Sequence, residues 1–119
     1  MEQGKILVAE DEESLRWVLK KALEDEGYWV QIAATGKLAR EYLGGTRFDV
    51  TLMDIKLPDV DGLTLLKETK EAGIDTAMIL MTAQNTMRNA IEAMKNGAFD
   101  YVTKPFDLEE ILVLVRRAV

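Results

Sequence analysis

Short, mostly apolar runs alternate along the chain with longer segments in which apolar residues recur every three to four positions. Runs of four to six such residues bounded by turn residues are typical of buried strands. Five are predicted as strands: residues 5–9, 28–33, 49–53, 77–81 and 99–102. The segments that follow them have the period of amphipathic helices with one apolar face. The pattern therefore predicts strand–helix units repeated along the chain.

The predicted helices are defined by their apolar faces and by residues that end or begin a helix. The residues expected on the buried faces are, helix by helix, Leu15, Val18, Leu19, Ala22 and Leu23; Leu38, Ala39, Tyr42 and Leu43; Leu63, Leu66 and Ala72; Met87, Ala90, Ile91 and Met94; and Leu108, Ile111, Leu112 and Val115. Glycines are expected to end the first four helices: Gly27, Gly44 with Gly45, Gly73 and Gly97. Asp107 with Glu110 three residues later predicts a capping box for the last helix. Charged residues such as Arg16 are expected on the outer faces.

The order of these elements predicts the fold class. Parallel strands need crossover connections, and strands that are apolar on both faces need cover on both sides. Strand–helix units filling 119 residues therefore predict an α/β fold, a doubly wound five-stranded parallel sheet with helices on both faces. We see no repeat or linker, which favours a single domain over residues 1–119. The last helical pattern runs almost to the final residue, which suggests a domain excised from a longer polypeptide, although a natural chain end within a final helix fits the pattern nearly as well.

Composition and charge narrow the possible chemistry. With 15 basic and 21 acidic residues the net charge is −6, so direct binding to nucleic acid or to an anionic membrane is not expected. No stretch approaches the roughly 18 apolar residues of a membrane span, and we expect a cytoplasmic protein. The chain contains no cysteine and no histidine. This excludes thiol nucleophiles, imidazole metal ligands, a Ser-His-Asp triad and a phosphohistidine on this chain.

Reactive side chains follow the predicted strands. They are Glu10, Asp11, Glu12 and Glu13 after the first strand, Asp54 after the third, Thr82 after the fourth, and Thr103 and Lys104 after the fifth. Ligands of such sheets bind at the carboxyl ends of the strands, where strand order reverses. Clustered carboxylates repel one another unless a hard cation such as Mg²⁺ lies between them, and a carboxylate can become an aspartyl phosphate. Each residue alone also fits an ordinary structural role, but their joint placement indicates phosphoryl transfer.

Four segments in this order and spacing resemble the receiver domain of bacterial two-component response regulators: VAEDEESLR, VTLMDIKLPDVDGL, MILMTA and GAFDYVTKPFD. The helix LRWVLKKAL and the segment GAFDYVTKPFDLEEILVLVRRA are most similar to the nitrogen-regulation (NtrC) class, whose receivers control ATP-dependent transcription activators. The resemblance covers essentially the whole chain. It implies the flavodoxin-like (βα)5 fold with strand order 2-1-3-4-5.

The resemblance also implies roles for the residues at the strand ends. Asp54 would be the phosphoacceptor, Lys104 would contact the phosphoryl group, and Thr82 would bond to it and shift when it arrives. Tyr101 would change rotamer together with Thr82. The peptide bond between Lys104 and Pro105 would be cis, as proline permits.

A magnesium site is implied at the same place. Asp11, Asp54 and the backbone carbonyl of Lys56 would bind Mg²⁺ directly, with Mn²⁺ as a possible substitute, while Glu10 would help through a water molecule. Glu10 departs from the pattern, because many members of the family have aspartate there. The longer side chain leaves direct and water-mediated contact open. Lys56 and Gln84 resemble the variable positions of the family, which would tune the lifetime of the phosphate.

These roles imply a signalling switch and not a metabolic enzyme, because the domain would catalyse only its own phosphorylation and dephosphorylation. Since the chain lacks histidine, the phosphohistidine donor must lie on a partner, a sensor histidine kinase. Phosphorylation would switch the face formed by the fourth helix, fifth strand and fifth helix, and so control homodimerisation and a C-terminal output domain such as an ATP-dependent transcription activator. Residues expected on the outside of this face are Arg88, Asn89, Glu92, Lys95, Val113 and Leu114.

Three other functions fit the sequence less well. A flavodoxin-like flavin or nucleotide binder would need glycine where the first strand–helix turn is acidic. A haloacid-dehalogenase-type phosphatase would need a second carboxylate two residues after Asp54, where Lys56 stands. A receiver that works unphosphorylated, as an adaptor, is disfavoured because every expected type of site residue is present. Visible absorbance would reveal a flavin, and turnover of a phosphomonoester would reveal a phosphatase.

Overall fold

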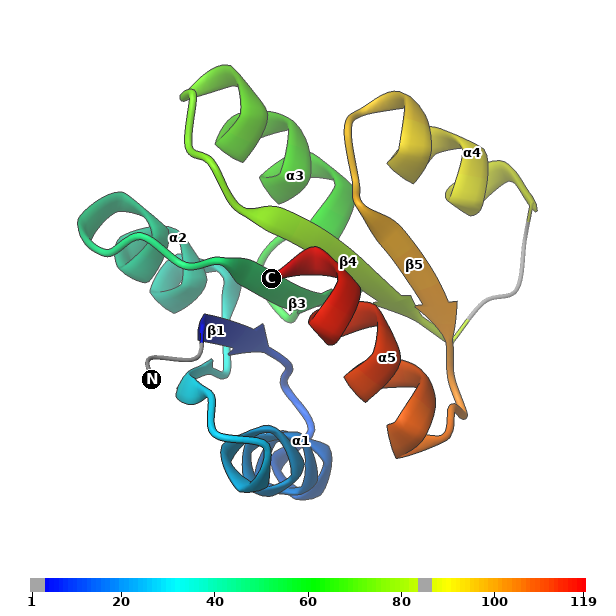
Figure 1. Ribbon diagram of the computed structural model, residues 1–119. Helices are drawn as coiled ribbons and strands as arrows, with labels where there is room; N and C mark the ends of the chain where they lie inside the picture. Colours follow the sequence, from blue (N-terminus) through cyan, green and yellow to red (C-terminus); the bar gives the residue numbers. More distant parts are fainter. Residues whose placement is uncertain (1–3, 84–86) are drawn as a thin grey trace.

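The computed structural model describes residues 4–83 and 87–119 and shows an open parallel sheet between two layers of helices (Figure 1). The strands are β1 (Lys5–Ala9), β2 (Trp29–Ala33), β3 (Val50–Asp54), β4 (Ala77–Thr82) and β5 (Asp100–Thr103). The helices are α1 (Glu13–Asp25), α2 (Gly36–Gly45), α3 (Gly62–Glu71), α4 (Met87–Lys95) and α5 (Leu108–Ala118). All neighbouring strands are parallel, in the order β2-β1-β3-β4-β5. The predicted fold class and strand order are confirmed.

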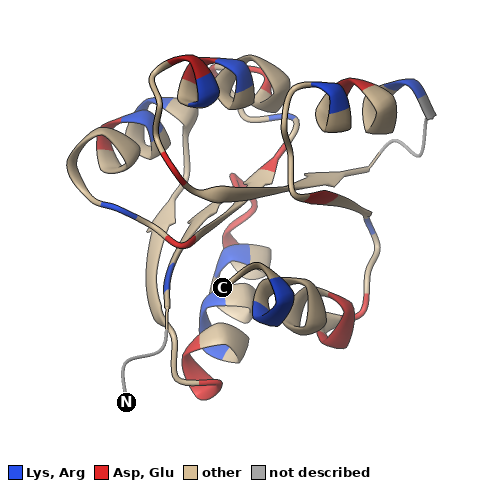
Figure 2. Cartoon of the chain, turned by 45° about the horizontal axis from the view of Figure 1, so that its top comes forward, with Lys and Arg blue, Asp and Glu red and all other residues tan. Residues whose placement is uncertain are grey.

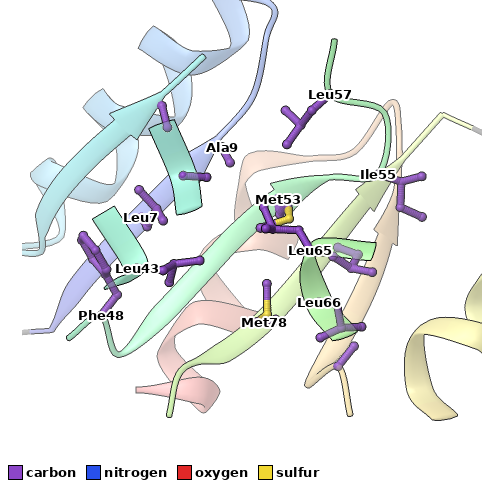
Figure 3. Packing of buried hydrophobic residues seen from close by; sticks show 14 of the residues in the cluster. Leu7, Ala9, Leu43, Phe48, Met53, Ile55, Leu57, Leu65, Leu66 and Met78 are labelled. Carbon is purple, nitrogen blue, oxygen red and sulfur yellow. The ribbon is translucent and has the colours of Figure 1, made fainter. Parts of the chain in front are cut away.

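Two hydrophobic layers hold the helices to the sheet. On one face, Leu19 and Leu23 of α1 and Ile111 of α5 are buried against the side chains of the central strands. On the other face, α2, α3 and α4 cover the sheet (Figure 1), and Figure 3 shows Leu43 and Leu66 packed among strand residues. The apolar surface buried on both faces of the sheet stabilises the fold by about 25 cal/mol per Å². Most of the Lys, Arg, Asp and Glu residues belong to the helices and loops, and few belong to the strands (Figure 2).

Strand boundaries differ from the prediction by one residue at several ends. β2 begins at Trp29 and β5 at Asp100, each one residue later than predicted, and β3 extends to Asp54. The sheet pairing sets these limits, because Asp54 is in register with Met81 of β4. Periodicity alone cannot show which backbone groups find a partner.

The predicted helix faces were wrong at several residues. Five residues expected in the core are 37–48% exposed: Val18, Leu38, Ile91, Met94 and Leu108. Ala72 is exposed beyond the end of α3, and the side chain of Met87 lies outside the part of the chain that the structure describes. The fourth helix shows the cause. It lies over β5, which is an edge strand, so only a narrow side of the helix can contact the sheet (Figure 1). Among the α4 side chains that the structure describes, that of Ala93 is fully buried.

Two further expectations about helices are corrected. Asp107 is the N-cap of α5 as predicted, but its side chain makes no capping hydrogen bond. Asn89, Glu92 and Leu114, expected outside, are partly buried, whereas Val113 is 44% exposed as expected. None of the helices in residues 4–83 and 87–119 combines the length and the apolar character that a membrane crossing requires.

Candidate functional site

The predicted site residues come together at the carboxyl edge of the sheet. β1 and β3 are neighbours, so Glu10, directly after β1, lies beside Asp54, the last residue of β3. Thr82 ends β4 and is in register with Thr103 of β5, which directly precedes Lys104. The topology alone therefore brings four strand ends to one place, as the sequence predicted.

Lys104 lies between two buried carboxylates. Its Nζ donates to Glu10 Oε1 at 2.5 Å and to Asp54 Oδ2 at 2.7 Å. Glu10 is fully buried and Asp54 is 7% exposed. Burying an unpaired charge is costly, so the ammonium group is what makes this pair of acids tolerable.

The second oxygen of Asp54 is held by the backbone that follows it. Lys56 N–H donates to Asp54 Oδ1 at 2.9 Å, and the chain then folds back so that Lys56 pairs with Asp61. The Gly62 N–H closes this loop by donating to the carbonyl of Ile55 at 2.6 Å. Both oxygens of Asp54 therefore have a fixed donor, one from a side chain and one from the backbone.

Burial and pairing shift the acidity of the groups around Asp54. Burial raises the pKa of Glu10 to about 7, although the hydrogen bond from Lys104 acts to lower it. Burial would lower the pKa of Lys104, but the hydrogen bonds to Asp54 and Glu10 outweigh it, and the pKa is raised. The lysine is therefore a permanent positive charge, while the proton content of Glu10 depends on pH near neutrality.

Three carboxylates are placed where they could share one cation. One carboxylate oxygen from each of Glu10, Asp11 and Asp54 lies within 4.8 Å of the others. Glu10 and Asp54 are buried, and Asp11 is exposed at the mouth of the site. Mg²⁺ prefers oxygen ligands, takes one or two carboxylates and keeps several waters, which an exposed side allows. This donor set fits Mg²⁺, and the Lys56 backbone lies in direct contact with Asp54.

Thr82 and Tyr101 connect the site to the β5 side of the molecule. Thr82 is 4% exposed, and its carbonyl accepts a hydrogen bond from the Lys104 N–H at 2.7 Å. Tyr101 is half-buried against the core layer beneath α2, α3 and α4. The peptide bond between Lys104 and Pro105 is cis, as the resemblance implied.

Two contacts beside the site, made by Arg16 and Asp59, were not predicted from the sequence. Arg16, expected in solvent, is a partly buried residue, and its guanidinium Nη1 donates to the carbonyls of Glu10 at 2.9 Å and Asp11 at 3.0 Å. The carboxylate of Asp59 accepts from the N–H groups of Gly36 and Lys37. Sequence spacing holds no signal for such contacts, because Asp59 and Gly36 are 23 residues apart. Gln84, expected to tune phosphate lifetime, lies outside the described residues.

A surface pocket of about 520 Å³ opens beside the site, between the start of α1 and the segment after β5. Its apolar lining includes Leu15, Val18, Pro105 and Phe106, and Lys104 also lines it. A smaller hollow on α4 is lined by Ala90, Ile91, Met94 and Lys95. The carboxylate site is therefore flanked by apolar surface on the side of α1.

Comparisons with known proteins agree on one family. The sequence model of the family described as "Response regulator receiver domain" matches residues 6–116. Over 119 residues the chain is 40% identical to the DNA-binding transcriptional regulator NtrC of Proteus hauseri, covering 100% of this chain and 25% of that protein. The receiver domain of the Francisella response regulator 1452 superposes with a TM-score of 0.94 at 33% identity, covering 98% of this chain and 96% of that one. The beryllofluoride-activated NtrC4 receiver domain dimer gives a TM-score of 0.90 at 33% identity, with coverage of 96% and 94%.

Proposed function

The chain belongs to the response regulator receiver domain family, and we propose that it is an NtrC-like switch phosphorylated on Asp54 by a sensor histidine kinase. The observation that carries the proposal is the carboxylate of Asp54, 7% exposed, bonded by Lys104 at 2.7 Å and grouped with two other carboxylates. The donor is a phosphohistidine on the partner, because this chain has no histidine.

In the proposed transfer, an oxygen of Asp54 forms a bond to phosphorus while the P–N bond of the donor breaks and its electron pair stays on the imidazole nitrogen. Lys104 places its positive charge against the phosphoryl oxygens, and Thr82 donates a hydrogen bond to one of them. Phosphoryl transfer depends mainly on such positioning and charge stabilisation. Water later cleaves the acyl phosphate, so the domain acts on itself and not on a pool of metabolites.

Mg²⁺ would be held by Asp11, Asp54 and the backbone carbonyl of Lys56, with Glu10 contributing through water. When bound, the ion neutralises charge on the phosphoryl oxygens and the surrounding acids. The chain itself prepares this site, because Lys56 N–H and Lys104 hold the Asp54 carboxylate in one orientation. Because the pKa of Glu10 is about 7, its carboxyl group is ionised at higher pH, and metal binding should be stronger there.

We place the docking of the kinase on the pocket beside α1. Val18 is 46% exposed there although it is apolar, and Leu15, Pro105 and Phe106 line the same hollow. Lys104 lines it as well, so a partner seated on this surface would present a donor group directly to the site. Val18→Asp is expected to slow transfer from a kinase and to leave phosphorylation by a small donor unchanged.

The output face is proposed to be α4, β5 and α5, reached from Asp54 through Thr82 and Tyr101. Adding a dianionic phosphoryl group draws Thr82 towards it, and the space left behind admits Tyr101. Ile91 and Met94 on α4 are 46% and 48% exposed, so an apolar surface is already available to a partner. NtrC4 supplies a precedent, since its activated receiver domain is described as a dimer.

Charge favours a second copy of the chain as one occupant of this face. α5 has Glu109 and Glu110 in its first turn and Arg116 and Arg117 in its last turn, a separation that Figure 2 shows as red at its start and blue towards its end. Two such helices related by a two-fold axis perpendicular to them would run antiparallel, with each acidic end opposite a basic end. Self-complementary contacts of this kind are typical of two-fold dimers.

The decisive experiment is incubation with Mg²⁺ and phosphoramidate, followed by intact mass spectrometry. We expect the mass of one phosphoryl group on the wild-type protein, none on Asp54→Asn, and wild-type labelling of Asp107→Asn, a matched change at an exposed aspartate without a side-chain capping bond. Labelling that persists in Asp54→Asn, or none in the wild type, would refute the assignment.

Dimerisation is tested by light scattering with beryllofluoride and Mg²⁺. Glu110→Lys should prevent the dimer, whereas Glu71→Lys on α3 should not. Mixing Glu110→Lys with Arg117→Glu should restore a heterodimer. If Glu110→Lys and Glu71→Lys dimerise to the same extent, the proposal that α5 lies in the dimer interface is wrong.

The chain spans about a quarter of the length of NtrC, so we further propose that residues 1–119 form one receiver domain of a longer cytoplasmic regulator. A C-terminal output domain, such as an ATP-dependent transcription activator, would carry the response. Fusing such a domain and measuring its ATPase activity with and without phosphorylation would test this.

A further inference from the structure

Asp59 ties the loop after Asp54 to a different part of the molecule. Its Oδ1 accepts from the Gly36 N–H at 2.7 Å and its Oδ2 from the Lys37 N–H at 2.9 Å. These are the first two residues of α2, and the N–H of the third, Leu38, is bonded by Thr35 Oγ1 at 3.2 Å. The free N–H groups at the start of α2 are thus satisfied partly by a residue from a loop 22 residues further on.

The contact is close as well as polar. A side chain could not be added at Gly36, because its Cβ would lie 2.0 Å from Cγ1 of Val60 and 3.1 Å from Oδ1 of Asp59. Val60 also packs against the core layer on that side of the sheet. Asp59 itself is exposed, so packing does not explain its position. The Gly36 N–H lowers the pKa of Asp59, which keeps the carboxyl group ionised at neutral pH.

The contact between Asp59 and the start of α2 lies near the end of the loop that runs from Asp54 to Gly62. Between Asp54 and Gly62 the chain closes on itself through the Lys56–Asp61 bridge and the Gly62 N–H bond to Ile55. Residue 59 therefore lies within the same closed loop as Lys56, whose N–H holds Asp54 Oδ1. On the other side, α2 follows β2, and the carbonyl of Ala33 at the end of β2 accepts from the Glu10 N–H at 3.0 Å.

We propose that Asp59 is a positioning residue for the metal site, which holds the loop of residues 55–61 against α2 and so fixes the backbone carbonyl of Lys56 relative to Glu10 and Asp54. This inference rests on the proposed function, because the ion at that carbonyl is the one required for phosphorylation. Asp59 does not touch the ion. It sets the geometry of a ligand three residues away.

The test compares Asp59→Ala with Asp59→Asn. Both remove one negative charge, but asparagine keeps one acceptor oxygen, so a difference between them separates the hydrogen bonds from the charge. Thr35→Ala is the matched control, because it removes a bond at the same helix start without releasing the loop. Gly36→Ala breaks the same contact from the α2 side and leaves Asp59 in place.

Two readouts are needed. The first is the Kd for Mg²⁺ by calorimetry, with no phosphodonor present. Outer-shell partners of metal ligands typically contribute 10- to 100-fold, and for this more distant residue we expect Asp59→Ala to raise the Kd about three- to tenfold. Asp59→Asn should raise the Kd for Mg²⁺ by less than Asp59→Ala does, and Thr35→Ala should have the Kd of the wild type. The second is the rate of labelling by phosphoramidate, which should recover in Asp59→Ala when Mg²⁺ is raised.

The outcomes are distinguishable from failure of the proposed function. If the wild type is labelled on Asp54 but Asp59→Ala binds Mg²⁺ as the wild type does, the role of Asp59 is overturned and the function stands. Equal losses in Asp59→Ala and Asp59→Asn would assign the effect to charge, and equal losses in Asp59→Ala and Thr35→Ala would assign it to α2 stability. Either result overturns the proposal. A wild type that neither binds Mg²⁺ nor is labelled overturns both.

Discussion

Replacing Gly62 with alanine tests whether the backbone after Asp54 is as closely packed as the structure indicates. A Cβ at Gly62 would lie 2.7 Å from the carbonyl oxygen of Asp54 and 2.8 Å from the Cα of Ile55. Both are backbone atoms, which cannot rotate away as a side chain can. The first turn of α3 or the end of β3 must therefore shift, and the phosphoacceptor is part of what shifts.

The magnitude follows from two opposing effects. Overpacking of this kind costs about 1–3 kcal/mol, while alanine gains up to about 1 kcal/mol over glycine in a helix. The net loss expected for Gly62→Ala is about 1–2 kcal/mol, which lowers Tm by roughly 3–10 °C for a domain of this size. Gly44→Ala is the control, because an added Cβ there has no neighbour within 4 Å. It should gain about 0.5–1 kcal/mol, since glycine is unfavourable within a helix.

The assay is thermal unfolding by circular dichroism, paired with the rate of Asp54 labelling by phosphoramidate. Gly62→Ala should be both less stable and slower to be labelled, whereas Gly44→Ala should be at least as stable as the wild type and labelled equally fast. If Gly62→Ala unfolds at the wild-type temperature, the close packing is wrong. If it is destabilised but labelled normally, the loop does not set the position of Asp54.

Three further predictions concern the site and the core. In EDTA, Tm should fall as pH rises from 5 to 8, because the pKa of Glu10 is about 7 in the folded protein and 4.5 in the unfolded chain, so its stabilising contribution is lost as pH rises through 7. Glu10→Gln should make Tm less dependent on pH over this range. An unchanged slope in this variant would contradict the assignment of the pKa to Glu10. Leu66→Ala, at a fully buried position, should cost about 2–5 kcal/mol in urea unfolding, whereas Val113→Ala at a 44% exposed position should cost under about 0.5 kcal/mol. Arg16→Ala should lose about 1 kcal/mol in the same assay, and Arg16→Lys should recover only part of it, because one ammonium group is a poor substitute for the guanidinium between two carbonyls.

The sequence predicted the site residues that lie at the ends of strands, but not those held by contacts with distant backbone groups. Glu10, Asp54, Thr82 and Lys104 were found because each stands at the end of a strand, and parallel strands bring their carboxyl ends to one edge. Asp59 was not found in this way. Its partners are backbone N–H groups, which no side-chain pattern records, and they lie on another element of the chain.

The helix faces show the same division. Periodicity identified Leu19 and Leu23 as core residues, and both are fully buried. It failed for Ile91 and Met94, which have the same spacing but are about half exposed. A helical period shows that one side of a helix is apolar. It does not show how wide a surface is available to cover that side, and α4 lies over an edge strand.

By itself, the sequence determined the order of the elements, the parallel sheet, the absence of any histidine to act as donor and the set of reactive residues at the strand ends. These depend on local period and on the type of residue, which are written along the chain. Only the tertiary structure decided that Lys104 binds two carboxylates at once, that burial raises the pKa of Glu10, and that Asp59 joins the loop after Asp54 to the start of α2. Each of these depends on distances and on exclusion of water between groups far apart in the chain, and those quantities exist only after the helices have packed on the sheet.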